Sequence, residues 1–366
     1  MMLPLPPGPP PRVGERAHVG EIDRFTDRID VRSPAEFAED HLPGAINLPI
    51  LDDAERARVG TMYVQVSAFE ARRMGAAIAS RNIARMLETY AADKPREWRP
   101  LVYCWRGGQR SRAVAHVFSE VGWRAAQLEG GYRAYRRHVI AQLATVPQRF
   151  DYRVICGLTG SGKSRLLRAL AAAGAQVLDL ETLAKHRGSL LGDLPGDPQP
   201  SQKWFESQLL EALQRLDVAR PVYVESESKR IGTVQLPEAL LVTMREASCV
   251  RVDTPRALRV ALLKDEYAHF LGDSGALSGR LAPLTEIVGR KTLARWIELA
   301  GADQHDALVA ELLDRHYDPL YLRSIDRNFP RHVDAIVASV DAISQSDFAA
   351  LANELIAREN AMAETT

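Results

Sequence analysis

The sequence has few cysteines, no long apolar run and no net charge. Three cysteines among 366 residues are too few for a disulfide framework, and their odd number fits a reducing compartment. No apolar run approaches the ~18 residues that a helix needs to span a membrane, so we expect no membrane partner. The proline-rich start of the chain lacks the basic region and unbroken apolar stretch of a secretory signal peptide. We therefore expect a cytoplasmic protein.

The zero net charge hides an uneven distribution. Hydrophobic residues make up 46% and charged residues 26%, as in soluble globular proteins, and the length predicts two domains of roughly 100–200 residues. Residues 1–146 carry 21 Lys and Arg against 17 Asp and Glu, and residues 103–138 carry seven Arg against two Glu. A basic segment of this kind suggests an anionic partner, although a solvated helix face has the same composition.

Apolar runs and turn signals predict an α/β fold in both halves of the chain. In the first half, Ser33–Glu36 has the pattern of a helix start, and residues 51–100 form a mostly helical insert. The predicted strands of this half are 29–32, one that follows the turn at residues 41–48, and 101–103. The predicted strands of the second half are 154–156, 177–180, 222–224 and 249–252. Beyond residue 284 we expect helices and no strand.

A loop between a predicted strand and a predicted helix combines a cysteine with glycines and arginines, in the order Cys104-Trp105-Arg106-Gly107-Gly108-Gln109-Arg110-Ser111. A helix N-terminus lowers the pKa of a thiol, because it directs amide N–H groups and positive potential at the sulfur. Adjacent glycines let successive N–H groups face one point, and arginines add fixed positive charge. Such a loop would hold a thiolate, an attached sulfur or selenium, or a tetrahedral oxyanion. The alternative, a buried free cysteine, is what we expect of Cys156 and Cys249 in their apolar strands.

Four blocks of sequence, in order and spacing, resemble a rhodanese domain: Asp30–Phe37, His41–Asn47, the Cys104 loop and Leu128–Tyr132. Rhodaneses carry sulfur or selenium on the loop cysteine, so the resemblance makes Cys104 the catalytic residue. The spacing from Cys104 to Arg110 is Cys-x5-Arg, as in the rhodanese-like cell-cycle phosphatases, and is longer than in sulfur-transferring rhodaneses. The longer loop suggests a pocket for a phosphate-bearing donor, held by Arg106, Gly107, Gly108, Gln109 and Arg110.

A second glycine-rich loop fits the P-loop pattern and lies between a predicted strand and a predicted helix, the context that this motif requires. Its amides can cradle a di- or triphosphate, Lys163 can reach terminal phosphate oxygens, and Ser164 can ligate a magnesium ion. The predicted phosphate-binding residues are Gly157, Gly160, Ser161, Gly162, Lys163 and Ser164.

Two acidic residues at predicted strand ends are candidates for binding magnesium or substrate. Asp179 follows the second strand of this half, where P-loop kinases of small molecules often place carboxylates that bind the acceptor. Glu225 resembles the acidic strand end that orients magnesium in P-loop proteins. A helix cap for Asp179 and a solvated strand end for Glu225 are equally good interpretations. No residue identifies itself as a base for hydrolysis, so the sequence establishes neither nucleotide hydrolysis nor a metal site.

A rhodanese domain followed by a P-loop domain is an uncommon pairing, and it resembles the bacterial tRNA 2-selenouridine synthase family along nearly the whole chain. Further stretches that carry this resemblance are Glu55–Tyr63, Leu183–Ser189 and Glu225–Ser228. The resemblance implies a transferase that replaces the 2-thio sulfur of a wobble uridine in tRNA with selenium from selenophosphate. It also implies S-geranylation of that uridine from geranyl diphosphate.

This resemblance distributes the chemistry over the chain. The Cys104 loop would handle selenium, and the P-loop would hold the prenyl diphosphate, with magnesium as the one metal that the pattern suggests. Three arginines at helical spacing would contact tRNA phosphates: Arg133, Arg136 and Arg137. An interdomain helix whose arginines pair with acidic groups of the second domain is the alternative.

We predict a proline-rich arm at residues 1–14, a rhodanese-like parallel-sheet domain at 15–147, and a P-loop α/β domain with a helical tail at 148–366. Two other functions stay open. A small-molecule kinase fused to a sulfurtransferase or phosphatase-like domain would use the same P-loop and the same Cys-x5-Arg spacing. In a nucleotide-gated RNA-binding module, Cys104 would have a structural role only.

Overall fold

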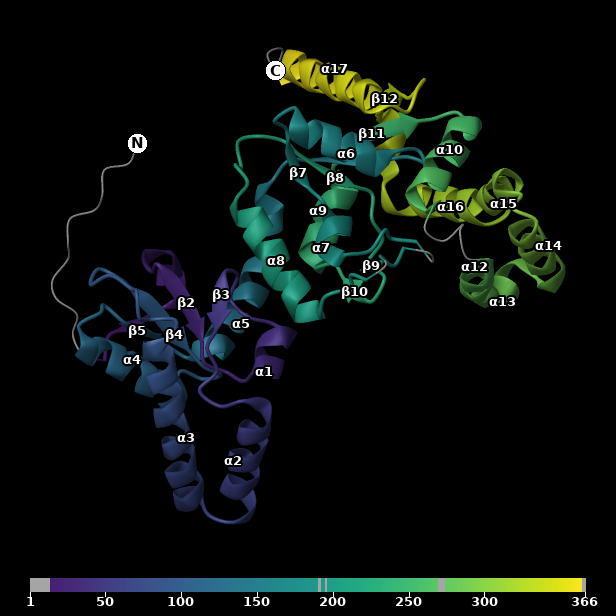
Figure 1. The fold of residues 1–366 in the computed structure, drawn as a ribbon. Helices are drawn as coiled ribbons and strands as arrows, with labels where there is room; N and C mark the ends of the chain where they lie inside the picture. The colour runs from purple at the N-terminus through teal and green to yellow at the C-terminus, as the bar shows by residue number, and fades with distance from the viewer. Residues whose placement is uncertain (1–13, 190–191, 195, 269–273, 364–366) are drawn as a thin grey trace. The chain divides into compact units, whose positions relative to one another are not determined.

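The computed structural model describes residues 14–189, 192–194, 196–268 and 274–363, and it divides into two compact units (Figure 1). Unit 1 comprises residues 1–142 and 201–211, and unit 2 comprises 143–200 and 212–366. The predicted proline-rich arm lies outside the described residues except for Gly14. No helix among the described residues has both the length and the apolar character to span a membrane.

Unit 1 contains a five-stranded, fully parallel sheet with the strand order β1-β5-β4-β2-β3. Its strands are β1 (Arg16–Ala17), β2 (Asp27–Asp30), β3 (Ala45–Asn47), β4 (Pro100–Tyr103) and β5 (Ala126–Leu128). Its helices are η1 (Val19–Arg24), α1 (Pro34–Glu39), α2 (Asp53–Gln65), α3 (Ala68–Glu88), α4 (Gln109–Val121) and α5 (Gly131–Leu143). Residues 201–211, which sequence analysis counted with the P-loop domain, add most of α8 (Gln202–Gln214) to this unit.

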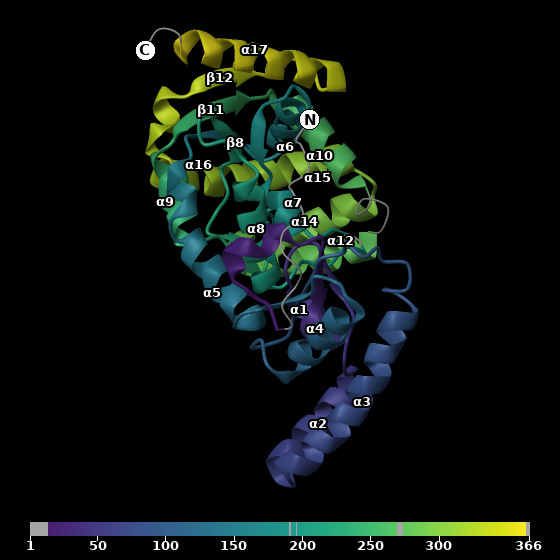
Figure 2. The same cartoon turned by 90° about the vertical axis from the view of Figure 1, so that its left-hand side faces the viewer.

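The predicted helical insert is an antiparallel pair, α2 and α3, that projects from the sheet of unit 1 (Figures 1 and 2). Its start is set by a reciprocal cap: Asp52 accepts a hydrogen bond from the N–H of Glu55 at 2.7 Å, and Glu55 accepts one from the N–H of Asp52 at 3.0 Å. Ser67 caps α3 without such a reciprocal bond: its hydroxyl oxygen accepts hydrogen bonds from the N–H groups of Phe69 and Glu70. These caps satisfy backbone donors at both helix starts, and the Ser67 cap also marks the turn where α3 begins after α2.

The core of unit 1 lies where the insert returns to the sheet. Trp98 packs against Phe118 and Trp123, with ring centroids 5.3 and 5.0 Å away. Beneath them, Ile29 and Val102 of neighbouring strands are fully buried. Aromatic pairs of this kind stabilise a core beyond the burial of their area, and here they fix β4 and α4, the two elements that flank the cysteine loop.

Unit 2 contains a second five-stranded parallel sheet, with the order β12-β11-β6-β8-β7. Its strands are β6 (Tyr152–Cys156), β7 (Gln176–Leu178), β8 (Val222–Glu225), β11 (Ser248–Asp253) and β12 (Ile336–Ser339), and β9 (Arg230–Ile231) and β10 (Val234–Gln235) form a separate hairpin. The strands that follow β6 in the chain, β7 and β8, lie on one side of it in the sheet, and the later strands β11 and β12 lie on the other side. The carboxyl end of β6 is therefore a topological switch point, where α/β folds bind ligands.

Helices cover this sheet and extend the unit beyond it. Those before β12 are η2 (Val146–Arg149), α6 (Lys163–Ala172), α7 (Leu180–Ala184), α9 (Glu238–Glu246), α10 (Arg256–Glu266), α12 (Ser274–Leu281), η3 (Ala282–Leu284), α13 (Thr285–Val288), α14 (Arg290–Gly301), α15 (His305–Leu312), η4 (Leu313–Tyr317), α16 (Asp318–Asn328) and η5 (Pro330–Asp334). The final helix, α17 (Gln345–Ala363), inserts Phe348 and Leu355 into the core around α6. A second apolar cluster surrounds the buried Trp296 of α14.

The α/β class and the two parallel sheets confirm the predicted fold class. The expectation of no strand beyond residue 284 is wrong, because β12 pairs in parallel with β11 at the edge of the sheet. Ile336 and Val337 are β-branched and were the available signal. The strand has only four residues, of which Ala338 alone is fully buried, so its pattern is weak between two helical segments.

Candidate active sites: the cysteine loop and the phosphate loop

Cys104 directly follows β4 and is almost completely buried, with 3% of its surface exposed. Its sulfur accepts two hydrogen bonds from the start of α4. The N–H of Gly108 donates to Sγ at 3.4 Å, and the hydroxyl of Ser111 donates to it at 3.2 Å. Donors at a helix N-terminus stabilise negative charge on the atom that they face. The predicted anion-binding loop therefore has the thiol at its centre.

Two glycines let this loop fold back against the start of α5. A Cβ atom on Gly107 would lie 2.7 Å from the carbonyl oxygen of Leu128, which leaves no room for a side chain. Gly107 and Gly131 have φ angles of +64° and +58°, in the region that favours glycine. The N–H of Tyr132 then donates to the carbonyl oxygen of Cys104 at 2.9 Å, so α5 holds the loop in place.

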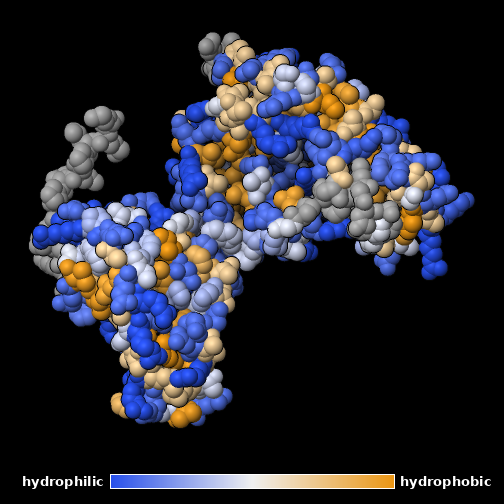
Figure 3. All heavy atoms as spheres, in the orientation of Figure 1, coloured by the Kyte–Doolittle hydropathy of each residue, from blue (hydrophilic) through white to orange (hydrophobic). Residues whose placement is uncertain are grey.

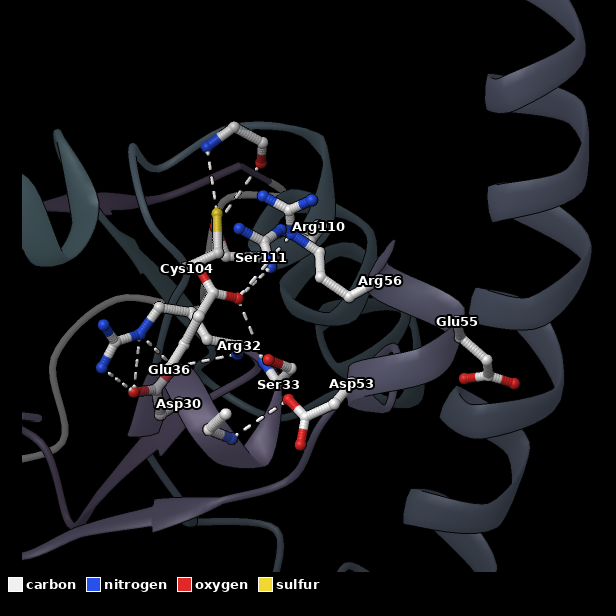
Figure 4. A network of polar contacts seen from close by, with 12 residues as sticks. Asp30, Arg32, Ser33, Glu36, Asp53, Glu55, Arg56, Cys104, Arg110 and Ser111 are labelled. Atoms are coloured by element: carbon white, nitrogen blue, oxygen red, sulfur yellow. Dashed lines mark hydrogen bonds and ion pairs between the residues drawn. The ribbon is translucent and has the colours of Figure 1, made fainter. Parts of the chain in front are cut away.

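Glu36 connects the cysteine loop to the helical insert (Figure 4). Nη1 of Arg110 lies 3.0 Å from its carboxylate, and Nε of Arg56 in α2 lies 3.9 Å from it. Burial raises the pKa of Glu36, but the hydrogen bond and charge of Arg110 outweigh this effect and hold the pKa below its ordinary value. Of the other predicted loop residues, Arg106 and Gln109 are exposed. Arg56 is a residue that the sequence analysis missed, since only its place in a family-like stretch singled it out.

The first rhodanese-like block forms a buried polar network beneath the loop. Arg32 and Asp30 are 1% and 0% exposed and form an ion pair at 2.6 Å. The guanidinium of Arg32 also lies 4.1 Å from the ring centroid of Tyr132, whose hydroxyl donates to Asp40 at 2.7 Å. Removing one partner of such a buried pair costs about 3–5 kcal/mol. This network supports the loop. None of these hydrogen bonds involves Sγ of Cys104.

The P-loop follows β6 at the switch point of the second sheet, and all six predicted phosphate-binding residues lie in it or at the start of α6. Gly160 and Gly162 have φ angles of +76° and +87°, and a Cβ on either would lie 2.6 Å from Leu263 or Phe348 respectively. Thr254 donates a hydrogen bond to the carbonyl oxygen of Ser161 at 2.8 Å. Glycine is thus required at both positions, and the loop is supported from the β11 side.

Lys163 is folded back onto its own loop. Its Nζ donates to the carbonyl oxygen of Gly157 at 2.8 Å and lies 5.4 Å from the ring centroid of Tyr321. The hydroxyl of Tyr321 accepts a hydrogen bond from the N–H of Gly157 at 2.6 Å. Tyr321 lies in α16, 164 residues further along the chain, and no motif pointed to it. It is a P-loop contact that only the three-dimensional structure reveals.

Three glutamates gather beside the P-loop. Oxygen atoms of Glu181, Glu225 and Glu227 all lie within 4.8 Å of one another, and the hydroxyl of Ser164 donates to Glu181 at 3.0 Å. Burial and the charges of the neighbouring glutamates raise the pKa of all three carboxyl groups. Oε1 of Glu225 is buried and accepts no hydrogen bond within the described part of the chain. Hard oxygen donors in this arrangement suit magnesium, so the residues fit the metal that the P-loop pattern suggests.

The structure separates the two predicted acidic candidates. Glu225 lies in the cluster, whereas Asp179 caps α7: its carboxylate accepts hydrogen bonds from the N–H and the hydroxyl of Thr182, both at 2.8 Å. The helix-cap interpretation is therefore the one that the geometry supports for Asp179. Sequence analysis missed the other two members: Glu181 directly follows the predicted strand 177–180, and Glu227 lies in the stretch Glu225–Ser228 that carries the family resemblance.

The three arginines predicted to contact tRNA lie on α5 but differ in their surroundings. Arg133 and Arg137 are exposed. Arg136 forms an ion pair with Glu206 of α8, and only 15% and 20% of these two side chains is exposed. The same part of α8 contributes Ser207, which donates to Asp40 at 2.9 Å. Arg136 thus serves packing within unit 1, as the alternative interpretation of this helix proposed, but with a partner from residues 201–211.

Comparison with known proteins gives two family matches. Residues 20–138 match the family model of the Rhodanese-like domain, and residues 150–280 match that of the tRNA 2-selenouridine synthase AAA domain. The tRNA 2-selenouridine synthase of Nitrosomonas europaea is 36% identical over 276 residues, which cover 74% of this chain and 71% of that protein. The tRNA 2-selenouridine synthase of Salmonella newport is 34% identical over 333 residues, covering 82% of this chain and 90% of that protein. A crystallised N-terminal domain from Clostridium difficile 630 is 32% identical with a TM-score of 0.31, and the match covers 34% of this chain and 98% of that one.

Proposed function

The chain belongs to the tRNA 2-selenouridine synthase family, and on this basis we propose how its two sites divide the work of that reaction. The chain is a tRNA 2-selenouridine synthase. In our proposal it acts in two steps, an S-geranylation of the wobble 2-thiouridine from geranyl diphosphate and a replacement of the geranylated sulfur by selenium from selenophosphate.

One observation supports this division of labour: the described chain has two glycine-rich loops, each between a strand and a helix, and only the loop of residues 104–111 contains a thiol. Gly108 and Ser111 direct their hydrogens at Sγ of Cys104, and Arg110 adds positive charge to this loop. Selenophosphate is a small tetrahedral anion and suits such a loop. The P-loop has no cysteine among its predicted phosphate-binding residues, but its glycine-rich backbone suits a diphosphate.

The P-loop would serve the first step by stabilising the leaving diphosphate. Lys163 would exchange its hydrogen bond to the carbonyl oxygen of Gly157 for one to a phosphate oxygen. Ser164 and the three clustered glutamates would hold a magnesium ion, which would neutralise charge on the diphosphate when it is bound. In this step the C1–O bond of geranyl diphosphate breaks, a bond between C1 and the 2-thio sulfur forms, and the N3 proton of the uridine passes to water. The P-loop therefore has to stabilise the leaving diphosphate, and no base for hydrolysis is needed.

In the second step, the bond between uridine C2 and sulfur breaks and a bond between C2 and selenium forms. Geranylthiol leaves with a proton, and water takes up the phosphoryl group of selenophosphate as inorganic phosphate. An alkylated sulfur is a better leaving group than the thiocarbonyl sulfur of 2-thiouridine. Cys104 would assist the delivery of selenium as a thiolate beside the donor, with the selenium passing to C2 at the selenide level, while the donors from Gly108 and Ser111 stabilise the charge on its sulfur.

The decisive experiment supplies the full chain with an anticodon stem-loop that contains 2-thiouridine, and follows the nucleosides by mass spectrometry. Geranyl diphosphate alone should yield S-geranyl-2-thiouridine, and selenophosphate added afterwards should yield 2-selenouridine. Selenation that needs no geranyl diphosphate and passes through no geranylated species would contradict the two-step proposal. ATP turnover stimulated by a small acceptor, without any change to the RNA, would instead support the small-molecule kinase.

A further inference from the structure

A cavity of about 1190 Å3 lies in unit 1 beside the cysteine loop, and its wall combines residues of α2, α3 and α4. Most of this wall is apolar, with Val59 and Val64 from α2, Ala76 and Ala79 from α3, and Ala113 from α4. Charged residues also line it, four arginines and one glutamate: Arg56, Arg72, Arg110, Arg112 and Glu15. The cavity exceeds the ~300–1,000 Å3 of most small-molecule sites, so it has room for a flexible apolar chain and part of a nucleoside.

The helical insert exposes apolar side chains at this cavity to an unusual degree. Tyr63 and Val64, which line the cavity, are 52% and 83% exposed, and Val66 at the end of α2 and Phe69 at the start of α3 are 72% and 69% exposed. Hydrophobic residues along the projecting hairpin are also visible in the surface view (Figure 3). A surface of this kind marks a site that binds an apolar partner.

The cavity begins at the turn of α4 that holds the reactive sulfur. Gln109 and Arg110 line it, and their neighbours Gly108 and Ser111 donate hydrogen bonds to Sγ of Cys104. At the same end, Arg56 and Arg110 converge on Glu36 (Figure 4). The cavity therefore has a cationic end next to the cysteine loop and an apolar wall along the helical insert.

We propose that this cavity binds the prenyl chain of the S-geranylated uridine during the selenation step, an inference that rests on the proposed function. The branched hydrocarbon chain would lie against the alanines and valines of the insert and α4. The arginines would face the phosphates of the RNA or of selenophosphate at the other end. The geranyl group then serves as a recognition handle as well as a leaving group, because burying it along the insert holds the adjacent C2–S bond at the Cys104 loop.

The test compares two neighbouring alanines of α3 that are both exposed. Ala76 lines the cavity and Ala77 does not, so Ala76→Trp fills the cavity while Ala77→Trp is a matched control. We expect the full chain to bind an anticodon stem-loop with S-geranyl-2-thiouridine at least about tenfold more tightly than one with 2-thiouridine, since burial of two methylene groups already has that effect. Ala76→Trp should abolish this preference and leave the affinity for the 2-thiouridine stem-loop unchanged. Ala77→Trp should keep the preference.

Several outcomes would overturn the proposal. A wild-type chain without the preference, or equal loss in both variants, would remove the cavity from recognition of the prenyl group. Loss of geranyl diphosphate binding in Ala76→Trp, with geranylated RNA bound as before, would assign the cavity to the prenyl donor. A preference that appears only after removal of residues 1–13 would identify that segment as the occupant, and a dimer that Ala76→Trp dissociates would identify a second copy.

The same assays separate this proposal from the proposed function. If the chain converts geranylated RNA to selenated RNA but shows no preference for the prenyl group, only the cavity assignment fails. If it neither makes nor uses geranylated RNA, the two-step function fails, and the cavity must bind something else.

Discussion

The hydroxyl of Ser111 lies 3.2 Å from Sγ of Cys104 and donates a hydrogen bond to it. Nε2 of Gln127 in β5 donates to the same hydroxyl oxygen at 2.8 Å and to the carbonyl oxygen of Gly108 at 3.0 Å. Gln127 thereby ties Ser111 to the loop backbone, and the hydroxyl hydrogen has two acceptors within reach, Sγ of Cys104 at 3.2 Å and the carbonyl oxygen of Gly108 at 3.4 Å. Gln127 of β5 thus holds the Ser111 hydroxyl beside the thiol.

This arrangement predicts that Ser111→Ala slows selenation about 10- to 100-fold, because it removes a donor that stabilises charge on the sulfur during transfer. Binding of the RNA should stay the same. Ser119→Ala is the matched control: Ser119 lies on the same helix, is equally a buried serine, and donates to the carbonyl oxygen of Ala115 at 2.8 Å. The rates are measured in single turnover with geranylated stem-loop, and an equal loss in both variants would reduce Ser111 to a structural role.

For the thiol itself, Cys104→Ser should abolish selenium incorporation while RNA affinity changes less than about threefold. The sulfur is almost completely buried, so it cannot contribute a large RNA contact. Mass spectrometry of the nucleosides and a binding isotherm on one preparation give both quantities. Selenation retained in the serine variant would remove Cys104 from the mechanism.

Short, local motifs were the predictable part of this protein. The cysteine loop and the P-loop each combine glycine, a charged residue and a reactive or phosphate-binding residue within eight positions. The backbone conformation of each loop is set by these neighbouring residues, so a short stretch of sequence is enough to predict it. Both lie where the sequence places them, between a strand and a helix. The α/β class followed from the alternation of apolar strands and helices for the same reason.

Contacts between distant segments were not predictable from one sequence. Tyr321 reaches the P-loop from α16, and Glu206 pairs with Arg136 from a segment that the sequence assigned to the other domain. Such contacts depend on how helices pack, and no local pattern encodes their partners. The apolar cavity could not be predicted for a related reason. The alanines and valines of α2, α3 and α4 have the sequence pattern of ordinary core residues, and only the packing of these helices shows that they line a cavity.

At the P-loop, Lys163→Ala should slow geranylation by at least about 100-fold and leave the selenation of already geranylated RNA within about threefold of wild type. Lysine acts there as a point charge on phosphate oxygens, and geranylated RNA no longer carries the diphosphate. Lys264→Ala is a suitable control, since it removes a lysine of the same unit that pairs with Asp306 at 2.8 Å. Equal loss of both steps would mean that the P-loop contributes to RNA binding or to folding of unit 2.

Acid sensitivity of unit 1 should depend on Asp27. Its carboxylate accepts hydrogen bonds from Tyr90, Lys94 and Trp98 at 2.8, 2.9 and 2.7 Å, which fasten the end of the insert to β2. Burial raises the pKa of Asp27, but these hydrogen bonds outweigh it and hold the pKa below its ordinary value. A lowered pKa in the folded state stabilises the fold above the ordinary pKa, and this stabilisation is lost as the pH falls through the folded-state pKa.

Asp27→Asn should therefore lower the free energy of unfolding by about 2 kcal/mol at pH 7, and the difference from wild type should shrink below about pH 4. Chemical denaturation from pH 3 to 8 measures it. Asp23→Asn is the control, because Asp23 is 96% exposed and its ion pair with Arg28 should contribute little at any pH. A difference that does not vary with pH would show that charge on Asp27 is not what stabilises the insert.

The arginines of α5 make two opposite predictions on one helix. Arg136 is held by Glu206 in a largely buried pair, so Arg136→Gln should lower the free energy of unfolding by about 2 kcal/mol and leave the salt dependence of RNA binding unchanged.

Arg133 and Arg137 are exposed, so replacing both with glutamine should leave stability unchanged. If they contact RNA phosphates, the slope of log K against log salt should become shallower by about two contacts for every RNA sequence. Thermal melts and binding isotherms at several salt concentrations, taken on the same preparations, measure both effects. A slope that stays the same in the double variant would mean that the exposed face of α5 does not contact RNA, and would shift the search for the basic surface to the arginines that line the cavity beside Cys104.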